Sequence, residues 1–150
     1  MYVFAGIKYG TINWFITNFI RRYTQMGITY GKKTWLIPDC FLNSVSKNES
    51  ISHEAICVLN TGDKDATINL TLFYEDRDKI EGDFVSFCAA GRTHHIRLDK
   101  IVGKSGNKIV RDVPYAILVE SDVEVVCQYS RLDTSEVEMA LMTTVAYPVE

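Results

Sequence analysis

The chain has 150 residues, of which 47% are hydrophobic, and its formal net charge is −3 at pH 7. This length fits a single globular domain, which buries roughly 70% of the surface that its unfolded chain exposes and needs no disulfides to fold. The four cysteines are far apart and form no CxxC pair, which excludes a zinc ribbon and predicts reduced thiols in a cytosolic protein.

The charge is unevenly distributed along the chain. Residues 1–33 contain five basic residues and no acidic one, whereas residues 34–150 contain the other 11 of the 16 basic residues and all 19 acidic ones. We therefore expect a basic, aromatic N-terminal extension at residues 1–30 and a separate domain at residues 31–150. The acidic domain argues against nucleic-acid binding, because affinity for phosphates comes mainly from clustered Lys and Arg.

The extension carries apolar side chains at helical spacing, namely Ile12, Phe15, Ile16, Phe19, Ile20 and Tyr23. Polar residues interrupt the extension too often for a membrane-spanning helix, and neither a basic start nor a small-residue cleavage site marks a signal peptide. Two alternatives remain. One is an amphipathic helix that rests on a membrane or partner surface, and the other, which we favour, is a poorly packed, disordered extension.

From Lys33 onward, apolar and polar residues alternate with the period of two that is typical of β-strands. The predicted strands are residues 34–38, 55–60, 67–74, 84–89, 92–98, 114–120, 123–130 and 139–147. Clusters of Asn, Asp, Ser and Gly predict turns at residues 60–65, 74–83 and 120–124. The pattern predicts an all-β, single-domain antiparallel β-sandwich of seven or eight strands, with a jelly-roll-like arrangement.

A polar corner interrupts the last of these stretches, within "QYSRLDTSEVEMALMTTVAYP" at residues 128–148. Ser135 followed by Glu138 fits a capping box, which predicts one helical turn starting at Ser135. Arg131 and Asp133 precede this turn. We expect them to pair with each other or with a neighbouring strand, because a corner needs donors and acceptors where a sheet ladder stops. This structural role is favoured over ligand binding.

No motif predicts catalysis, so we expect neither an enzyme nor a bound cofactor. The chain has no GxSxG nucleophile elbow, and "VGKSGNK" lacks the earlier glycine and the following helix of a phosphate-binding loop. His94 and His95 are neighbours on a predicted strand and point to opposite faces, so they cannot grip one metal ion together. We expect no catalytic residue and no metal site.

Three stretches of the chain, "ISHEAICVLNTGDKDATINLTLFYEDRD", "AGRTHHIRL" and "VESDVEVVCQYSRLDTSEVEMALMTTVAYP", closely resemble the sensory rhodopsin transducer family. The resemblance runs from about residue 31 to residue 148, and the ordered agreement of "SHEAICVLNTGD" and "QYSRLD" makes it specific. The N-terminal extension has no counterpart in the family pattern.

The resemblance implies a small cytoplasmic β-sandwich that assembles as a homotetramer and has no known catalytic activity. It also implies a soluble signalling adaptor, which relays a signal from a membrane receptor such as a sensory rhodopsin by protein–protein contact. For relatives without a rhodopsin, the family implies a small, sugar-like ligand, and DNA contact has also been proposed. The tetramer and the signalling role rest on the resemblance alone.

The family pattern is present at Trp35, Pro38, Asp39, Ser52, His53, Glu54, Asn60, Gly62, Asp63, Arg92, Thr93, His95, Arg97, Gln128, Arg131, Leu132, Asp133, Glu138 and Tyr147. Two positions depart from it. Cys40 stands where the family has glycine, and Gly91 stands where the family has a further arginine. The second departure weakens the proposal that a basic cluster holds an anion or DNA there.

The residues that we expect to bind a ligand or partner are Trp35, Asp39, His53, Glu54, Arg92, His95, Arg131 and Asp133. In the adaptor hypothesis, they contact a membrane receptor or another protein. In the alternative, a small polar ligand of carbohydrate type stacks on Trp35 and the charged side chains supply hydrogen bonds, although tryptophans on strands more commonly lie in the core. If nucleic acid is bound at all, the basic extension is the expected contact.

Overall fold

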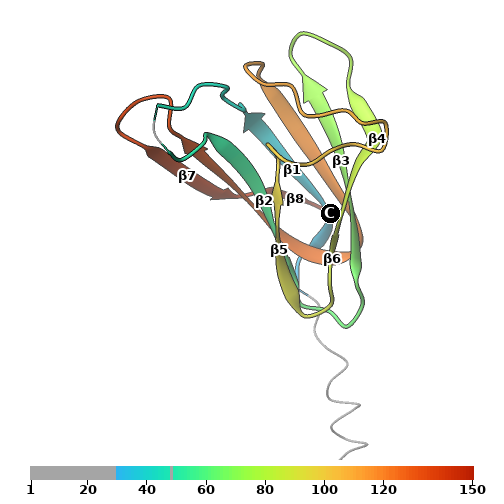
Figure 1. Cartoon of the computed structure of the whole chain (residues 1–150). Helices are drawn as coiled ribbons and strands as arrows, with labels where there is room; N and C mark the ends of the chain where they lie inside the picture. Colours follow the sequence, from blue (N-terminus) through green and yellow to red (C-terminus); the bar gives the residue numbers. More distant parts are fainter. Residues whose placement is uncertain (1–29, 48) are drawn as a thin grey trace, which may run out of the picture.

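The computed structural model describes residues 30–47 and 49–150, and these residues form eight β-strands and no helix (Figure 1). The strands are β1 (Lys32–Cys40), β2 (His53–Asn60), β3 (Ala66–Tyr74), β4 (Ile80–Cys88), β5 (Arg92–Arg97), β6 (Tyr115–Asp133), β7 (Ala140–Val145) and β8 (Tyr147–Val149). In this part of the chain there is no helix that could span a membrane. The helix or extension predicted at residues 1–29 lies outside the described residues.

The eight strands form two antiparallel sheets that share β6. The first sheet has the order β4-β3-β6-β1-β8. In the second sheet, β6 lies between β2 and β7, and β5 pairs with the other side of β2. The antiparallel, all-β fold that the alternation predicted is therefore confirmed, with eight strands.

The strand β6 is a single strand of 19 residues, and it passes from one sheet into the other. Its first part pairs with β1 and β3, and its last part pairs with β2 and β7. The turn predicted at residues 120–124 is wrong. Ser121 is buried within the strand, and the Asp122 carboxylate accepts a hydrogen bond from the Thr67 backbone N–H at 2.8 Å, which supports the strand where it changes sheets.

The C-terminal part of the chain also departs from the prediction. The strand predicted at residues 139–147 is split into β7 and β8 at Ala146, which is buried and donates its backbone N–H to the Cys127 carbonyl at 3.0 Å. The helical turn predicted at Ser135 is absent. Instead, the Ser135 backbone N–H donates to the Asp133 carboxylate at 2.8 Å, and such a local bond stabilises a turn without a helix.

One hydrophobic core lies between the two sheets. Along β3, the fully buried Ile68, Leu70 and Leu72 alternate with polar residues, as a strand with one buried face requires. Burying each such side chain stabilises the fold by about 1.5–3 kcal/mol. Because β6 contributes core residues from Tyr115 to Tyr129, both sheets pack around the same strand.

The start of β1 requires a glycine. Gly31 has a φ angle of 108°, and a Cβ atom at this position would lie only 2.0 Å from the carbonyl oxygen of Val125. Any larger residue would therefore push β1 away from β6. This close approach fixes the first residue of β1 against the middle of β6, and it sets the position of the rest of β1.

The strand β7 lies at the outer edge of the second sheet, on the left in Figure 1, and all six of its residues are exposed. Leu141, which is 73% exposed, points to the side of the sheet that faces away from the core. Met142 and Thr144 lie on the opposite side, in register with Arg131 and Tyr129. An exposed apolar strand of this kind is unusual for a protein that acts alone.

Candidate functional site

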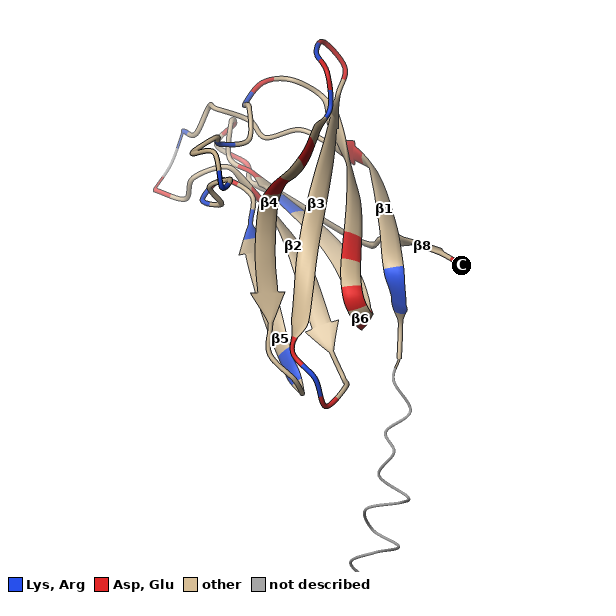
Figure 2. Cartoon of the chain, turned by 90° about the vertical axis from the view of Figure 1, so that its right-hand side faces the viewer, with Lys and Arg blue, Asp and Glu red and all other residues tan. Residues whose placement is uncertain are grey.

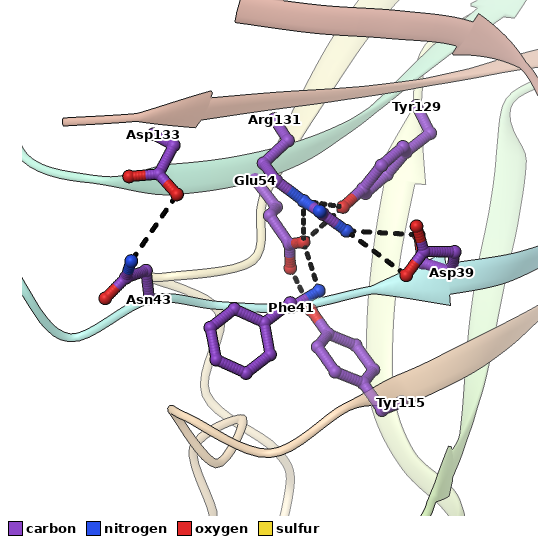
Figure 3. Close-up of polar contacts among 8 residues, drawn as sticks. All are labelled: Asp39, Phe41, Asn43, Glu54, Tyr115, Tyr129, Arg131 and Asp133. Carbon is purple, nitrogen blue, oxygen red and sulfur yellow. Dashed lines mark hydrogen bonds and ion pairs between the residues drawn. The ribbon is translucent and has the colours of Figure 1, made fainter. Parts of the chain in front are cut away.

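The most unusual side chain in the fold is Glu54 on β2, because it is a carboxylate with no exposed surface. Four donors surround it (Figure 3). The hydroxyls of Tyr115 and Tyr129 donate to its two oxygens, the Phe41 backbone N–H donates at 2.7 Å, and the Arg131 Nε donates at 3.2 Å. The Phe41 backbone N–H and the Arg131 guanidinium can only donate, and both stabilise negative charge on this carboxylate. We call these five residues the Glu54 cluster.

The register of the strands explains how the Glu54 cluster assembles. Glu54 on β2 lies directly opposite Arg131 on β6. Tyr129 precedes Arg131 by two positions and so lies on the same face of β6. Tyr115 comes from the other end of β6, opposite Cys40 at the end of β1. The change of sheets within β6 therefore brings both ends of one strand to a single carboxylate.

Arg131 connects this buried carboxylate to the surface. Its Nε bonds both Glu54 and the Tyr129 hydroxyl, the latter at 3.0 Å, and its guanidinium lies 5.8 Å from the centre of the Tyr129 ring. Its Nη2 lies 3.4 Å from the Asp39 backbone oxygen and 3.6 Å from the Asp39 carboxylate. The Asp39 side chain is 80% exposed, so one end of this arginine is fixed in the interior and the other is available at the surface.

The groups around Glu54 keep their protons at neutral pH. Burial raises the pKa of Tyr115 and of Tyr129 well above the ordinary value of 10.0, and the negative charge of Glu54 raises both further. Burial and the charge of Glu54 also raise the pKa of Cys40, whose thiol lies beside Tyr129. The Glu54 cluster therefore supplies fixed donors and a buried charge, and it contains no thiolate or phenolate that could act as a nucleophile.

A groove with a volume of about 600 Å³ borders the Glu54 cluster. We call it the β1–β7 groove, and it is lined by Leu36, Ile37, Pro38, Asp39, Tyr129, Met142, Thr144, Val145, Ala146, Tyr147 and Pro148. Its walls are mainly apolar, and Asp39 is its one charged lining residue among those of the described chain. Asp39 and Tyr129 belong to both the groove and the network around Arg131, so an occupant of the groove would act directly on that network.

Three of the eight sequence-predicted site residues meet here, namely Asp39, Glu54 and Arg131. Asp133 lies on the same strand as Arg131 but bonds other groups. It accepts from the side chain of Asn43 at 3.4 Å and from the Ser135 backbone N–H, whose hydrogen bond holds the pKa of the Asp133 carboxyl below its usual value. Arg131 and Asp133 therefore each pair with neighbouring segments and not with each other.

The other four predicted residues lie away from the groove. Trp35 is in the core, 4% exposed, and its indole N–H donates to the carbonyls of Lys32 and Val125. His53 is on β2 and contacts the Ile51 carbonyl oxygen at 2.8 Å. Arg92 and His95 are exposed on β5. Trp35 thus has no free ring face at which a sugar could stack.

Sequence reasoning missed several residues of the site. The sequence pattern places Tyr115 and Tyr129 on strands without assigning them to a site, and it does not show that Met142 and Tyr147 share a surface. The spacing of Tyr129 and Arg131 could have placed these two on one face. Tyr115 could not have been joined to them, because the sequence predicted two strands where β6 is one.

Within residues 30–47 and 49–150, no group of three His, Cys, Asp or Glu side chains is arranged to hold a metal ion. The four cysteines are free thiols, and three of them are buried. Burial raises the pKa of Cys127 to about 12, so its thiol also stays protonated at neutral pH. The chemistry that the site offers is thus ion pairing and apolar contact.

The family model described as the Anabaena sensory rhodopsin transducer matches residues 30–148. No curated protein matches the chain.

Two solved structures share both sequence and fold with the chain. Protein 1070 of Thermotoga maritima is 35% identical, with a TM-score of 0.71, over 80% of this chain and 97% of its own. The Anabaena sensory rhodopsin transducer is 29% identical, with a TM-score of 0.62, over 71% of this chain and 92% of its own. The family model, the identities and the shared fold lead to one conclusion: the chain belongs to the Anabaena sensory rhodopsin transducer family.

Proposed function

We propose that the chain is a non-enzymatic, cytoplasmic signalling adaptor that relays a signal by contact with a membrane receptor such as a sensory rhodopsin. The observation that carries this proposal is the family match over residues 30–148. The β1–β7 groove supports it, because an open apolar groove with a charged residue in its wall suits a segment of another protein.

The Glu54 cluster connects the groove to the interior of the domain, so an occupant of the groove can change the contacts of Arg131. The ion pair between Arg131 and Asp39 is exposed on the Asp39 side and is therefore weak, so a partner can compete for either residue at low cost. The contacts of Arg131 with Glu54 and Tyr129 are sheltered, and they join β2 and β6. Arg131 on β6 thus pairs with Glu54 on β2 and with Asp39 on β1, and so links the two sheets. A partner that displaces Asp39 removes one of the negative charges that surround Arg131.

A binding titration tests the proposed function. The full chain is titrated into a microbial sensory rhodopsin, purified in detergent, while light scattering follows the assembly state of the chain. We expect saturable binding in the micromolar range or tighter, as is typical of transient signalling contacts. If high micromolar concentrations give no binding although the assembly of the chain is intact, the proposed receptor contact is wrong.

We also propose that the chain forms a homotetramer, with the outward face of β7 in a subunit contact. Leu141 is 73% exposed on that face, and Val137 and Met139 just before β7 are exposed as well. Light scattering should give the mass of four 17.1-kDa chains. Leu141→Glu should lower this mass, because it buries an unpaired charge, whereas Val102→Glu, on an exposed bridge elsewhere, should not. A wild-type chain that remains monomeric would refute the tetramer.

The β1–β7 groove also favours a second candidate function, the binding of a small molecule. Its volume of about 600 Å³ lies within the range of ligand pockets, which is roughly 300–1,000 Å³. Its lining is mainly apolar, however, and Trp35 is enclosed in the core. A carbohydrate needs hydrogen-bonding groups along its length, so the groove matches an apolar protein segment better than a sugar.

A further inference from the structure

The β1–β7 groove leaves large apolar side chains in contact with solvent. Leu36 and Met142 are each 40% exposed, and Tyr147 is 68% exposed. Acidic side chains flank these residues. Asp39 is part of the lining, and Glu120 on β6 is opposite Thr34, two positions before Leu36 on β1. Figure 2 shows acidic positions at the end of β1 and along β6. An occupant with an apolar face and basic side chains would complement this surface.

We propose that residues 12–23 of the same chain dock in the β1–β7 groove. Phe15, Ile16 and Phe19 belong to an apolar set at helical spacing, which is the pattern that helix-in-groove recognition requires. At this spacing the polar side of the segment carries Arg21, opposite the apolar set, and Arg22, at the edge of that set, and residues 1–29 contain no acidic residue. The segment therefore offers an apolar face to the groove, and Arg22 offers a positive charge to Glu120 beside it, whereas Asp39 already pairs with Arg131.

The chain between the segment and β1 is long enough for this contact. Residues 24–30 join the segment to β1. Seven extended residues span up to roughly 24 Å. Leu36 lies five positions beyond Gly31 along β1, which corresponds to about 17 Å in a strand. The segment can thus fold back to the groove of its own domain without stretching the connection.

Docking within one chain has a consequence for partner binding. A tethered segment has an effective concentration in the millimolar range, so even a weak contact keeps the groove occupied most of the time. An external partner must then displace the segment, which makes the groove selective for partners that bind more tightly than the chain's own segment. The contact within the chain is independent of the receptor proposal, because it concerns the free protein.

Methyl NMR of the full chain, labelled at its methionine methyl groups, tests the docking. Met142 lines the groove, whereas Met139, which is 59% exposed, does not. The wild-type chain is compared with a variant that combines Phe15→Ser and Phe19→Ser. The control variant combines Thr17→Ser and Asn18→Ser on the polar side of the segment. Both variants leave residues 30–150 unchanged, so the domain itself is the same in every sample.

We expect the Met142 signal to move by more than its linewidth in the Phe15→Ser, Phe19→Ser variant and to stay in place in the control, while Met139 is unaffected in both. The docking proposal is overturned if the Met142 signal is the same in the wild type and the Phe variant, or if the control moves it equally. If the Met142 signals of the wild type and the Phe variant become equal on dilution, the groove is occupied by the segment of a second copy. That result also contradicts docking within one chain. A rhodopsin titration without binding would refute the receptor proposal and leave this result unchanged.

Discussion

Glu54→Ala is expected to lower the free energy of unfolding by about 3–5 kcal/mol, which is the cost of removing one partner from a buried ion pair. The substitution leaves the hydroxyls of Tyr115 and Tyr129 and the backbone N–H of Phe41 without their acceptor. Each buried donor without a partner costs about 1–3 kcal/mol. Arg131 also loses its sheltered carboxylate, and the one carboxylate that still pairs with it is that of the exposed Asp39. Urea denaturation at a fixed protein concentration, followed by circular dichroism, measures the loss.

Two further variants show whether the loss of stability in Glu54→Ala comes from leaving the buried charge of Arg131 without its partner. Asp39→Ala removes the exposed partner of Arg131, so we expect a loss below about 1 kcal/mol. Replacing Glu54 and Arg131 together by methionine should cost less than Glu54→Ala alone, because no unpaired charge is then buried. Equal losses for Glu54→Ala and Asp39→Ala would contradict the role that we assign to the Glu54 cluster.

Raising the pH from about 8 to about 11 is expected to destabilise the fold steeply above about pH 10. Burial raises the pKa of Tyr115 and of Tyr129 above the ordinary value of 10.0, so in this range the folded chain keeps these protons while the unfolded chain releases them. Because the folded state then binds more protons, the contribution of these two tyrosines to stability is complete below pH 10 and falls as the pH rises toward their folded pKa. Each such group contributes up to about 1.4 kcal/mol per pH unit.

Urea denaturation at each pH measures the free energy of unfolding, and its change per pH unit is the slope to be compared. The raised pKa values of Cys40 and Cys127 act with the same sign from their ordinary value of 9.0 upward. Tyr129→Phe should therefore reduce the slope without abolishing it. Tyr147→Phe removes an exposed phenol and serves as the matched control. If Tyr129→Phe and the wild type lose stability at the same rate between about pH 10 and 11, the Tyr129 hydroxyl is not held protonated as we infer.

Strands of this fold could be predicted where apolar and polar residues alternate along them. The stretch at 67–74 is an example, since its alternation predicted almost all of β3 (Ala66–Tyr74). The continuity of β6 could not be predicted in the same way. Ser121 and Asp122 are typical turn residues, and only the contact of Asp122 with Thr67 on another strand shows that they belong to a strand.

The candidate site was predictable only in part, for a related reason. Glu54 and Arg131 are polar residues in otherwise apolar strands, and such residues stand out in a sequence. Their pairing depends on the register of β2 against β6, and local patterns do not specify that register. The β1–β7 groove arises because β7 leaves the sandwich while β8 returns to β1, and only the three-dimensional arrangement shows this.

We propose that the β1–β7 groove is the surface by which this transducer-family chain binds its receptor, and a comparison of three chains can test this claim. The wild type, Met142→Arg and Val102→Arg are titrated by calorimetry into a detergent-purified microbial sensory rhodopsin. Met142 lines the groove, whereas Val102 is exposed on an isolated bridge outside the groove and outside the proposed subunit contact. We predict that Met142→Arg weakens binding at least tenfold, or about 1.4 kcal/mol, and that Val102→Arg changes it far less. Equal affinities for the wild type and Met142→Arg would contradict the claim.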